Sequence, residues 1–378
     1  MKRFTWYPVG RIILLLSILF SLLVVFGCSK KEPKEIKFGS ILPLSGDAAV
    51  WGQNTKEGID LAVEEINKKG GIDGLAIRII YEDSQAVPKQ GVSAIQKLIT
   101  VDKVPAVIDD SVSSVTLAMA PIAQQNHVVI VSVGATAPAI SQAGEYIFRL
   151  WNSDAYEGEI TAQYVYGEAG FSKICILYVN NDYGRGLMGV FRRDFEKKGG
   201  EVLITESFDQ GAPDFRSQLA KVKQKPIQAI YLVGYPQDTP KLLIQAKEIG
   251  MNVPFFGTVI FNDPQLISVA GEAAIGIIFP FPKEPEGEAV KEFGEKFKEK
   301  YGKEAGATAD TGYDAVFLIK ASIELSGGYR GEDIQKGLMM IKDYRGVSGE
   351  IEFDENGDVH KAMGMKIVRD GKFVWLND

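Results

Sequence analysis

Residues that perform catalysis or bind metals are scarce in this sequence. Its 378 residues include two histidines, His127 and His360, and two cysteines, Cys28 and Cys175. The HExxH pair, the CxxC pair, the GxSxG turn and the P-loop are all missing. The carboxylates are scattered, and none pair off as acid and base. We therefore expect no enzyme, no bound metal and no cofactor. Cys175 lies in an apolar run, where a buried, inert thiol is expected.

An excess of positive charge and long apolar runs are also lacking. The formal net charge is −7, so we expect no nucleic-acid binding, which needs a basic face. The long uncharged run at 12–26 is shorter than the roughly 20 residues of a membrane-spanning helix. Its length and the preceding Lys2 and Arg3 are typical of a secretory signal. No second such span follows residue 28, which disfavours a one-piece transmembrane receptor.

Cys28 stands where the apolar run ends. The sequence VFGC at 25–28 resembles the lipobox of bacterial lipoproteins, in which the cysteine is lipidated and becomes the new N-terminus; Phe26 is bulkier than the usual residue. The resemblance implies a signal peptide at 1–27 and a lipid anchor with a charged tether at 28–35. The folded part would then lie outside the cytoplasm, in the periplasm or at the cell surface. The alternative is an uncleaved signal anchor in which Cys28 is incidental.

The remaining chain alternates short apolar runs with amphipathic stretches. We predict strands at 36–42, 75–83, 104–109 and 128–133, and helices at 54–71, 88–100 and from Ser113. A second set of strands is predicted at 173–179, 201–208, 229–234, 252–258 and 274–280, with helices from Tyr183 and near 214–224 and 238–249. Helices near 286–301, 308–326 and 331–341 and hairpin strands within 349–376 follow. Single helices between strands indicate βαβ units and parallel sheets, so the pattern predicts two α/β lobes.

Five stretches carry a resemblance to a known family. They are 38–74, 104–140, 179–187 (VNNDYGRGL), 231–238 (YLVGYPQD) and 349–359. In this order they resemble the periplasmic solute-binding proteins of the leucine/isoleucine/valine type, which are substrate-binding lipoproteins of ABC transporters. The resemblance extends over essentially all of 36–376.

The resemblance implies the type I periplasmic binding fold, in the α/β class. Two doubly wound α/β lobes are joined by three crossovers, with a ligand cleft between them. Lobe 1 is expected to comprise 36–154 plus 284–346. Lobe 2 is expected to comprise 155–283 plus 347–378.

Two segments of lobe 1 are candidates for binding a carboxylate. Ser113 and Ser114 fall at a predicted helix N-terminus, where free N–H groups, the helix dipole and a hydroxyl suit an anion. The plain alternative is an N-cap. Thr136 follows a strand, at the sheet edge where open α/β sheets bind ligands. The resemblance implies that Ser113 and Thr136 hold an amino acid's carboxylate and that the Gly134 carbonyl takes its amino group, with Ala135 in the same ligand-binding segment.

Aromatic residues are candidates for the walls of the cleft. Trp51 is expected on a glycine-flanked loop after the first strand, and the resemblance makes it a wall. Tyr183 and Tyr235 match tyrosines that the second lobe contributes when it closes. The alternative for Trp51 is a lid over core residues. The alternative for each tyrosine is a surface position. Trp151 and Tyr156 flank the first crossover and either line the pocket or pack the hinge.

Val259 departs from the family pattern. An acidic residue in the loop corresponding to 256–263 often pairs with the ligand's ammonium, and the match places Val259 there. Valine accepts no hydrogen bond, and an unpaired buried ammonium costs on the order of several kcal/mol. Either Asn262, Asp263 or another acid substitutes, or the ligand lacks an α-ammonium.

These features predict the extracytoplasmic solute-binding component of an ABC importer. It would capture a small carboxylate-bearing ligand, a branched-chain or related amino acid, by hinge closure and deliver it to a membrane permease. One alternative is a binder of aromatic or aliphatic carboxylates without an α-amino group. The others are a ligand-sensing pair of receptor lobes and an extracytoplasmic enzyme on the same scaffold. We expect a monomer.

Overall fold

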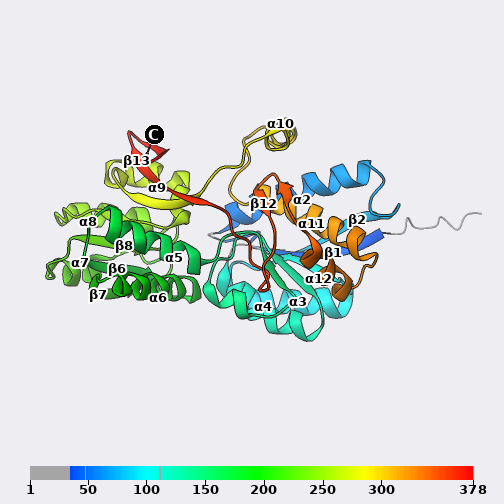
Figure 1. Cartoon of the computed structure of the whole chain (residues 1–378), viewed down its shortest axis with the longest axis horizontal. Helices are drawn as coiled ribbons and strands as arrows, with labels where there is room; N and C mark the ends of the chain where they lie inside the picture. The colour runs from blue at the N-terminus through cyan, green and yellow to red at the C-terminus, as the bar shows by residue number, and fades with distance from the viewer. Residues whose placement is uncertain (1–34, 47, 110–111, 378) are drawn as a thin grey trace, which may run out of the picture.

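The two predicted α/β lobes are present and lie side by side along the long axis of the molecule (Figure 1). The computed structural model describes residues 35–46, 48–109 and 112–377. The expected signal peptide and Cys28 lie outside these residues. The C-terminal segment crosses from one lobe to the other before it ends in β13 and β14 (Figure 1).

Lobe 1 contains a five-stranded parallel sheet in the order β2-β1-β3-β4-β5. The strands are β1 (Glu35–Leu42), β2 (Ala76–Asp83), β3 (Ala106–Asp109), β4 (Val129–Ser132) and β5 (Ile147–Arg149). The helices are α2 (Ala49–Lys68), α3 (Pro88–Lys97), α4 (Ser113–Gln125), α10 (Glu288–Tyr301), α11 (Ala309–Ser326) and α12 (Gly331–Met340). Successive side chains of β3 and β4 belong alternately to two apolar clusters, one on each face of the sheet. One cluster includes residues of α3 and α4, and the other includes residues of the remaining helices. Both sheet faces are therefore buried, as continuous apolar runs predict.

Close packing of α2 on α11 joins the N-terminal part of lobe 1 to the later helices. Ile59, Ala62 and Ile66 of α2 are buried on the face that their spacing predicts. A Cβ atom at Gly58 would stand 1.9 Å from the carbonyl oxygen of Ala309. Only glycine permits this approach, which brings the helices following β10 back onto the first lobe.

Lobe 2 contains a seven-stranded sheet in the order β14-β13-β10-β9-β8-β6-β7. Its parallel strands are β6 (Lys173–Val179), β7 (Glu201–Phe208), β8 (Ala229–Val233), β9 (Phe255–Phe256) and β10 (Ile278–Pro282), and the antiparallel ones are β13 (Met363–Arg369) and β14 (Lys372–Trp375). The helices are α5 (Asp154–Gln163), α6 (Asp182–Lys197), α7 (Arg216–Lys223), α8 (Thr239–Glu248) and α9 (Pro264–Ala270). Cys175 in β6 is fully buried, and burial raises the pKa of its thiol, which confirms the expectation of an inert cysteine.

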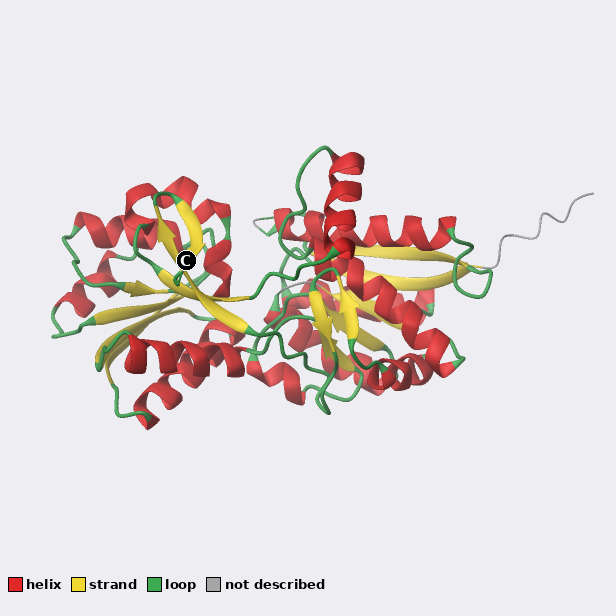
Figure 2. Cartoon of the chain, turned by 45° about the horizontal axis from the view of Figure 1, so that its top comes forward, coloured by secondary structure: helices red, strands yellow, loops and turns green. Residues whose placement is uncertain are grey.

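Three connecting segments, 150–153, 283–287 and 352–362, run between the lobes (Figure 2). They are hydrogen-bonded to one another. The Asn152 side chain donates to the Lys361 carbonyl (2.8 Å) and accepts from the Lys361 N–H (2.7 Å). The Lys283 N–H donates to the Ala362 carbonyl (2.8 Å). The hinge therefore consists of three connecting segments, the third of which is hydrogen-bonded to each of the other two.

The third crossover begins later than the expected boundary at 347. The short hairpin of β11 (Tyr344–Gly346) and β12 (Gly349–Ile351) precedes it. Val347, Phe353 and Val359 pack into the hydrophobic core of lobe 1. Their apolar side chains thus hold this stretch on lobe 1, and only β13 and β14 join the lobe 2 sheet.

Candidate functional site

Ser113 and Thr136 meet at the carboxyl edge of the lobe 1 sheet. Ser113 opens α4 after β3, Thr136 follows β4, and these strands are neighbours. The Ser113 Oγ accepts hydrogen bonds from the N–H groups of Thr136 (3.2 Å) and Ala137 (3.1 Å). The exposed fractions of Ser113 and Thr136 are only 1% and 5%. The fold thus brings together two residues that the sequence places far apart.

The first turn of α4 offers donors to an anion. The N-cap residue is Val112 rather than either serine, and no side chain of the described residues makes a capping bond, so the plain N-cap interpretation of Ser113 and Ser114 is wrong. The N–H groups of Val115 and Thr116 donate to the Val112 carbonyl (2.9 and 3.1 Å), whereas those of Ser113 and Ser114, the first two of the helix, have no acceptor within it, and the helix dipole is positive there. Because the Ser113 Oγ already accepts two hydrogen bonds, its own O–H can donate to a carboxylate.

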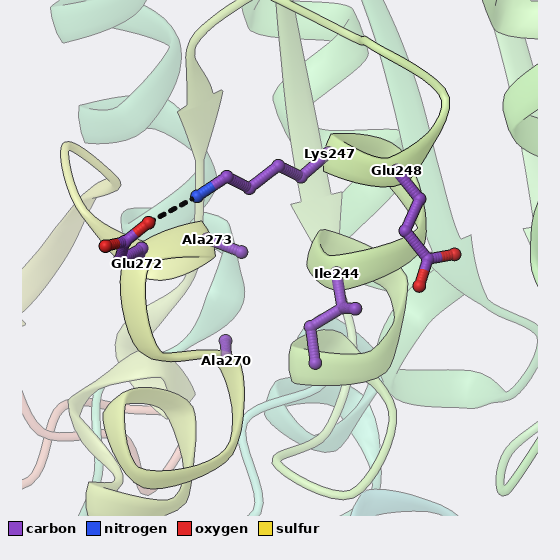
Figure 3. Close-up of a pocket in the computed structure, with 6 residues that line it drawn as sticks. All are labelled: Ile244, Lys247, Glu248, Ala270, Glu272 and Ala273. Carbon is purple, nitrogen blue, oxygen red and sulfur yellow. Dashed lines mark hydrogen bonds and ion pairs between the residues drawn. The ribbon is translucent and has the colours of Figure 1, made fainter.

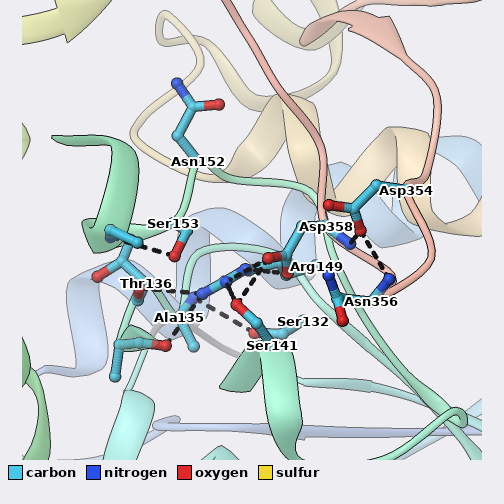
Figure 4. Close-up of polar contacts among 12 residues, drawn as sticks. Ser132, Ala135, Thr136, Ser141, Arg149, Asn152, Ser153, Asp354, Asn356 and Asp358 are labelled. Atoms are coloured by element: carbon cyan, nitrogen blue, oxygen red, sulfur yellow. Dashed lines mark hydrogen bonds and ion pairs between the residues drawn. The ribbon is translucent and has the colours of Figure 1, made fainter. Parts of the chain in front are cut away.

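A buried ion pair fixes the loop that carries Thr136 (Figure 4). The Arg149 guanidinium, at the end of β5, is fully buried and donates to Asp358 through Nε (2.6 Å) and Nη2 (2.8 Å). Its Nη1 donates to the carbonyls of Thr136 (3.0 Å) and Ala137 (3.1 Å), and Nη2 also donates to Ser141. All five N–H donors of the guanidinium are therefore engaged. No local feature of the sequence points to this pair, because the partners are 209 positions apart.

Gly134 and Ala135 lie in the same loop, immediately before Thr136. Ala135 is buried and donates its N–H to the Ser132 Oγ (3.3 Å), whereas Gly134 is half-buried. The loop is thus held by backbone contacts at Ala135 and by Arg149 at Thr136. Its polar groups are positioned before any ligand arrives.

Tyr183 and Tyr235 meet in lobe 2 at the carboxyl ends of β6 and β8. Their ring centroids are 5.3 Å apart, and both residues are buried, at 2% and 4% exposed. The Tyr183 hydroxyl donates to the Thr258 Oγ1 (3.0 Å), and the Tyr235 hydroxyl accepts from the Asn181 side chain (3.2 Å). The alternative of surface positions is therefore wrong for both.

Trp51 spans the two lobes. It lies in the first turn of α2, so the expectation of a loop was wrong. Its Nε1 lies 3.5 Å from the Asp263 Oδ2, and its ring meets the Tyr235 ring edge-on at 6.1 Å. It also packs against the hydrophobic core of lobe 2. A lobe 1 side chain thus completes the aromatic group of lobe 2.

Asp154 and Glu157 are buried carboxylates that sequence reasoning did not select as site residues. They open α5 and are 0% and 1% exposed. The Glu157 Oε1 accepts a hydrogen bond from the Val259 N–H (3.1 Å), and the Asp154 N–H donates to the Thr136 carbonyl (2.8 Å). A signal was available in the sequence SDAYEGE, but two acids in a first turn ordinarily face water.

Burial raises the pKa of both carboxyls. The pKa of Asp154 rises to about 7, against the smaller lowering effects of the Thr136 hydroxyl and the Arg149 charge. Burial, and then the neighbouring Asp154 charge, raises the pKa of Glu157 well above its ordinary value. Within the described part of the chain, neither carboxylate oxygen of Asp154 makes a hydrogen bond of regular geometry. The pair therefore retains protons at a pH where ordinary carboxyls are ionised.

Trp151 and Tyr156 pack at the hinge. The Trp151 ring meets the Phe281 ring edge-on at 6.1 Å, and the Lys361 ammonium lies 5.9 Å from its centroid. The Tyr156 ring meets the His360 ring edge-on at 6.1 Å. These contacts favour the hinge-packing alternative for both residues.

Figure 3 shows a hollow in lobe 2, lined by none of these residues. It is lined by Ile244, Lys247, Glu248, Ala270, Glu272 and Ala273. An exposed ion pair between Lys247 and Glu272 (2.9 Å) crosses it. It offers neither an aromatic wall nor buried polar groups, so we assign it no ligand.

The histidines contribute to no metal site. His127 is exposed and contacts Glu332 (3.1 Å), and His360 contacts Asp354 (3.3 Å). In residues 35–46, 48–109 and 112–377, no group of three His, Cys, Asp or Glu side chains could hold a metal ion. No helix within the same ranges has the length and apolar character needed to cross a membrane.

The two lobes, the hinge and the residues between them define a two-lobed α/β binding protein. Residues 35–372 match the periplasmic binding protein family, and the chain belongs to that family. It is 28% identical to the leucine-, isoleucine-, valine-, threonine- and alanine-binding protein of Pseudomonas aeruginosa, over 91% of this chain and 93% of that protein.

Solved structures show the same likeness. The leucine-binding protein LivK from Thermotoga maritima is 30% identical, with a TM-score of 0.83 over 90% of this chain and 97% of that one. The branched-chain amino acid transporter substrate-binding protein LivJ from Streptococcus pneumoniae, in complex with isoleucine, is 30% identical. Its TM-score is 0.80 over 90% of this chain and 98% of that one.

Replacing Asp358 by Asn is expected to destabilise the fold. The substitution leaves the buried Arg149 charge uncompensated, so the free energy of unfolding should fall by about 3 kcal/mol or more. The matched control is Glu355→Gln, which removes an exposed charge from the same crossover. Urea denaturation of both variants measures the difference. Equal stabilities would contradict the structural role of the ion pair.

The raised carboxyl pKa predicts a pH dependence of the ligand-free protein. Folded Asp154 binds its proton more tightly than the unfolded chain does, so its contribution to stability is present at pH 4 and is lost as pH rises towards about 7. Three pKa units correspond to on the order of 4 kcal/mol. The parent should therefore lose stability relative to Asp154→Asn over this range, in parallel urea titrations. Parallel profiles for the two proteins would show that Asp154 has an ordinary pKa.

Proposed function

We propose that this protein is the extracytoplasmic solute-binding component of an ABC importer. The observation that supports the proposal is that polar donors of lobe 1 and aromatic rings of lobe 2 both lie at the carboxyl ends of strands. Ser113 and Thr136 supply the donors from lobe 1, and Tyr183 and Tyr235 supply rings from lobe 2. Open α/β sheets bind ligands at this edge. The relatives named above bind leucine, isoleucine or valine, which supports a ligand of that size for this protein.

Binding would proceed by hinge closure. The ligand's carboxylate binds first to the N-terminus of α4 and the hydroxyls of Ser113 and Thr136. Lobe 2 then closes over it, because only the closed form makes contacts from both lobes. Trp51, which already contacts Tyr235 and Asp263, would stabilise that form. A membrane permease would bind the closed shape, and the ligand would leave chemically unchanged.

The ligand is a small carboxylate, and the amino acids are the first class to test. A carboxylate without an α-amino group is the second, because Val259 offers no acceptor for an ammonium. Two substitutes considered for Val259 are engaged elsewhere. Asp263 caps α9 by accepting the Gln265 N–H (2.8 Å) and lies near Trp51, and Asn262 accepts from Lys366 (3.3 Å).

The hydroxyls of Ser113 and Thr136 should be needed for affinity. Ser113→Ala combined with Thr136→Ala removes two charge-assisted hydrogen bonds, so affinity should fall by about 100-fold or more. The ligand is first found by a thermal-shift screen of residues 29–378 against amino acids and aromatic and aliphatic carboxylates, and affinity is then measured by calorimetry.

The matched control is Ser93→Ala with Thr100→Ala, two exposed hydroxyls in the same lobe. Unchanged affinity of the Ser113 and Thr136 double variant would refute the carboxylate site. A ligand at a hundredfold its dissociation constant stabilises the protein by roughly 2.7 kcal/mol, so a panel without any shift would contradict the proposed ligand class.

We further propose that Cys28 anchors a monomer to a membrane by its lipid, with residues 1–27 removed. In a bacterium that expresses the full chain and is fed radiolabelled palmitate, the parent should carry the label at the size of residues 28–378, and Cys28→Ala should carry none. An unlabelled parent at the size of the uncleaved chain would instead favour a signal anchor.

A further inference from the structure

Asp154 and Glu157 form a buried acidic pair, and no positively charged side chain among the described residues is bonded to either. Arg149 is the cation whose charge reaches Asp154, but its five N–H donors are bonded to Asp358, Ser141 and two carbonyls. Both oxygens of Asp154 are buried and lack a regular hydrogen-bond partner within the described residues. Buried carboxylates of this kind are costly unless a proton or a cation neutralises them.

The pair lies between the carboxylate donors and Val259. On one side, the Asp154 N–H donates to the carbonyl of Thr136, the residue proposed to hold the ligand's carboxylate (2.8 Å). On the other side, Glu157 accepts the Val259 N–H (3.1 Å). In an α-amino acid the ammonium and the carboxylate are carried by adjacent carbons. An acceptor for the ammonium must therefore lie beside the carboxylate site, and this pair does.

We propose that Asp154 and Glu157 bind the ammonium group of an α-amino-acid ligand, with Glu157 taking the place of the acid missing at Val259. The assignment rests on the proposed function and narrows its ligand class. Asp154 and Glu157 both lie in the first turn of α5, immediately after the first crossover, so the ammonium would bind where the hinge enters the closing lobe. A carboxylate without an ammonium would leave the pair uncompensated.

Binding of an ammonium should also release a proton. The acidic pair retains protons when empty, and a bound cation favours its ionised form. The other ionisable groups facing the pair are Tyr183 on α6 and Tyr231 on β8, both buried and neutral, and Arg149 on β5. Affinity should therefore rise between about pH 5 and 7, and calorimetry in buffers of different ionisation heat should detect the released proton.

The decisive experiment compares amino acids with the same molecules lacking the amino group. Calorimetry would be run with leucine and 4-methylpentanoate, isoleucine and 3-methylpentanoate, and phenylalanine and 3-phenylpropanoate. The parent should bind at least one amino acid about 100-fold more tightly than its counterpart. Glu157→Gln should reduce that ratio to about tenfold or less. Glu159→Gln, which removes an exposed charge from the same helix, should leave it unchanged.

The possible outcomes distinguish a failure of the ammonium site from a failure of the proposed solute-binding function. If the parent binds a deaminated acid as tightly as its amino acid, the ammonium site is refuted while the proposed function stands. The ammonium site is also refuted, and the proposed function stands, if Glu157→Gln keeps the parent's full ratio of amino-acid affinity to deaminated-acid affinity. If no compound of the panel binds, the proposed function fails, and the ammonium site fails with it. The ratio is internal to each variant, so partial unfolding does not affect it. Should Glu157→Gln not fold, the parent's ratio and proton release decide.

Discussion

The ion pair of Arg149 and Asp358 is the contact on which the site's geometry depends. It joins the last strand of the lobe 1 sheet to the third crossover, and the same guanidinium holds the loop of Thr136. Because the pair is buried, small displacements are costly. Asp358 and Val359 therefore move with lobe 1, and bending must occur beyond them. Lys361, whose backbone forms two hydrogen bonds with the Asn152 side chain, lies just beyond Val359, where the bending is expected.

The hinge and the proposed site lie next to each other in the chain, which would let a small ligand act on the position of a whole lobe. The first crossover runs directly into α5, whose first turn carries Asp154 and Glu157. Glu157 contacts the loop of Val259, and Asp154 contacts the loop of Thr136. A ligand that touches both carboxyls therefore acts on the segment that bends. Its differential contacts in the closed form shift the population of that form.

The sequence predicted the bounds of several elements correctly. The strands at 173–179 and 201–208 have the predicted bounds, and α4 begins at Ser113 as expected. Trp51 was misplaced because Gly52 was taken as a sign of a loop. A Cβ there would stand 2.2 Å from the Pro43 carbonyl oxygen, so glycine lets the helix pack closely against the chain that follows β1. The acids of SDAYEGE were visible in the sequence, but the burial of Glu157 was not, because the loop of Val259 that contacts it lies 102 positions away.

A single chain of contacts links every part of the site. Trp51 meets Tyr235, Tyr235 meets Tyr183, and Tyr183 is bonded to Thr258. Val259, the residue after Thr258, donates to Glu157, and Asp154 donates to the loop of Thr136. The series of contacts thus ends on lobe 1, where Trp51 began it. The aromatic half offers apolar surface, and the acidic half carries the charge that must be neutralised. A ligand with a zwitterionic head and an apolar side chain would satisfy both halves at once, and closing the lobes without one would bury the two carboxyls at a cost in free energy. Selectivity for such a ligand and the need for it to close the lobes would then have the same physical origin.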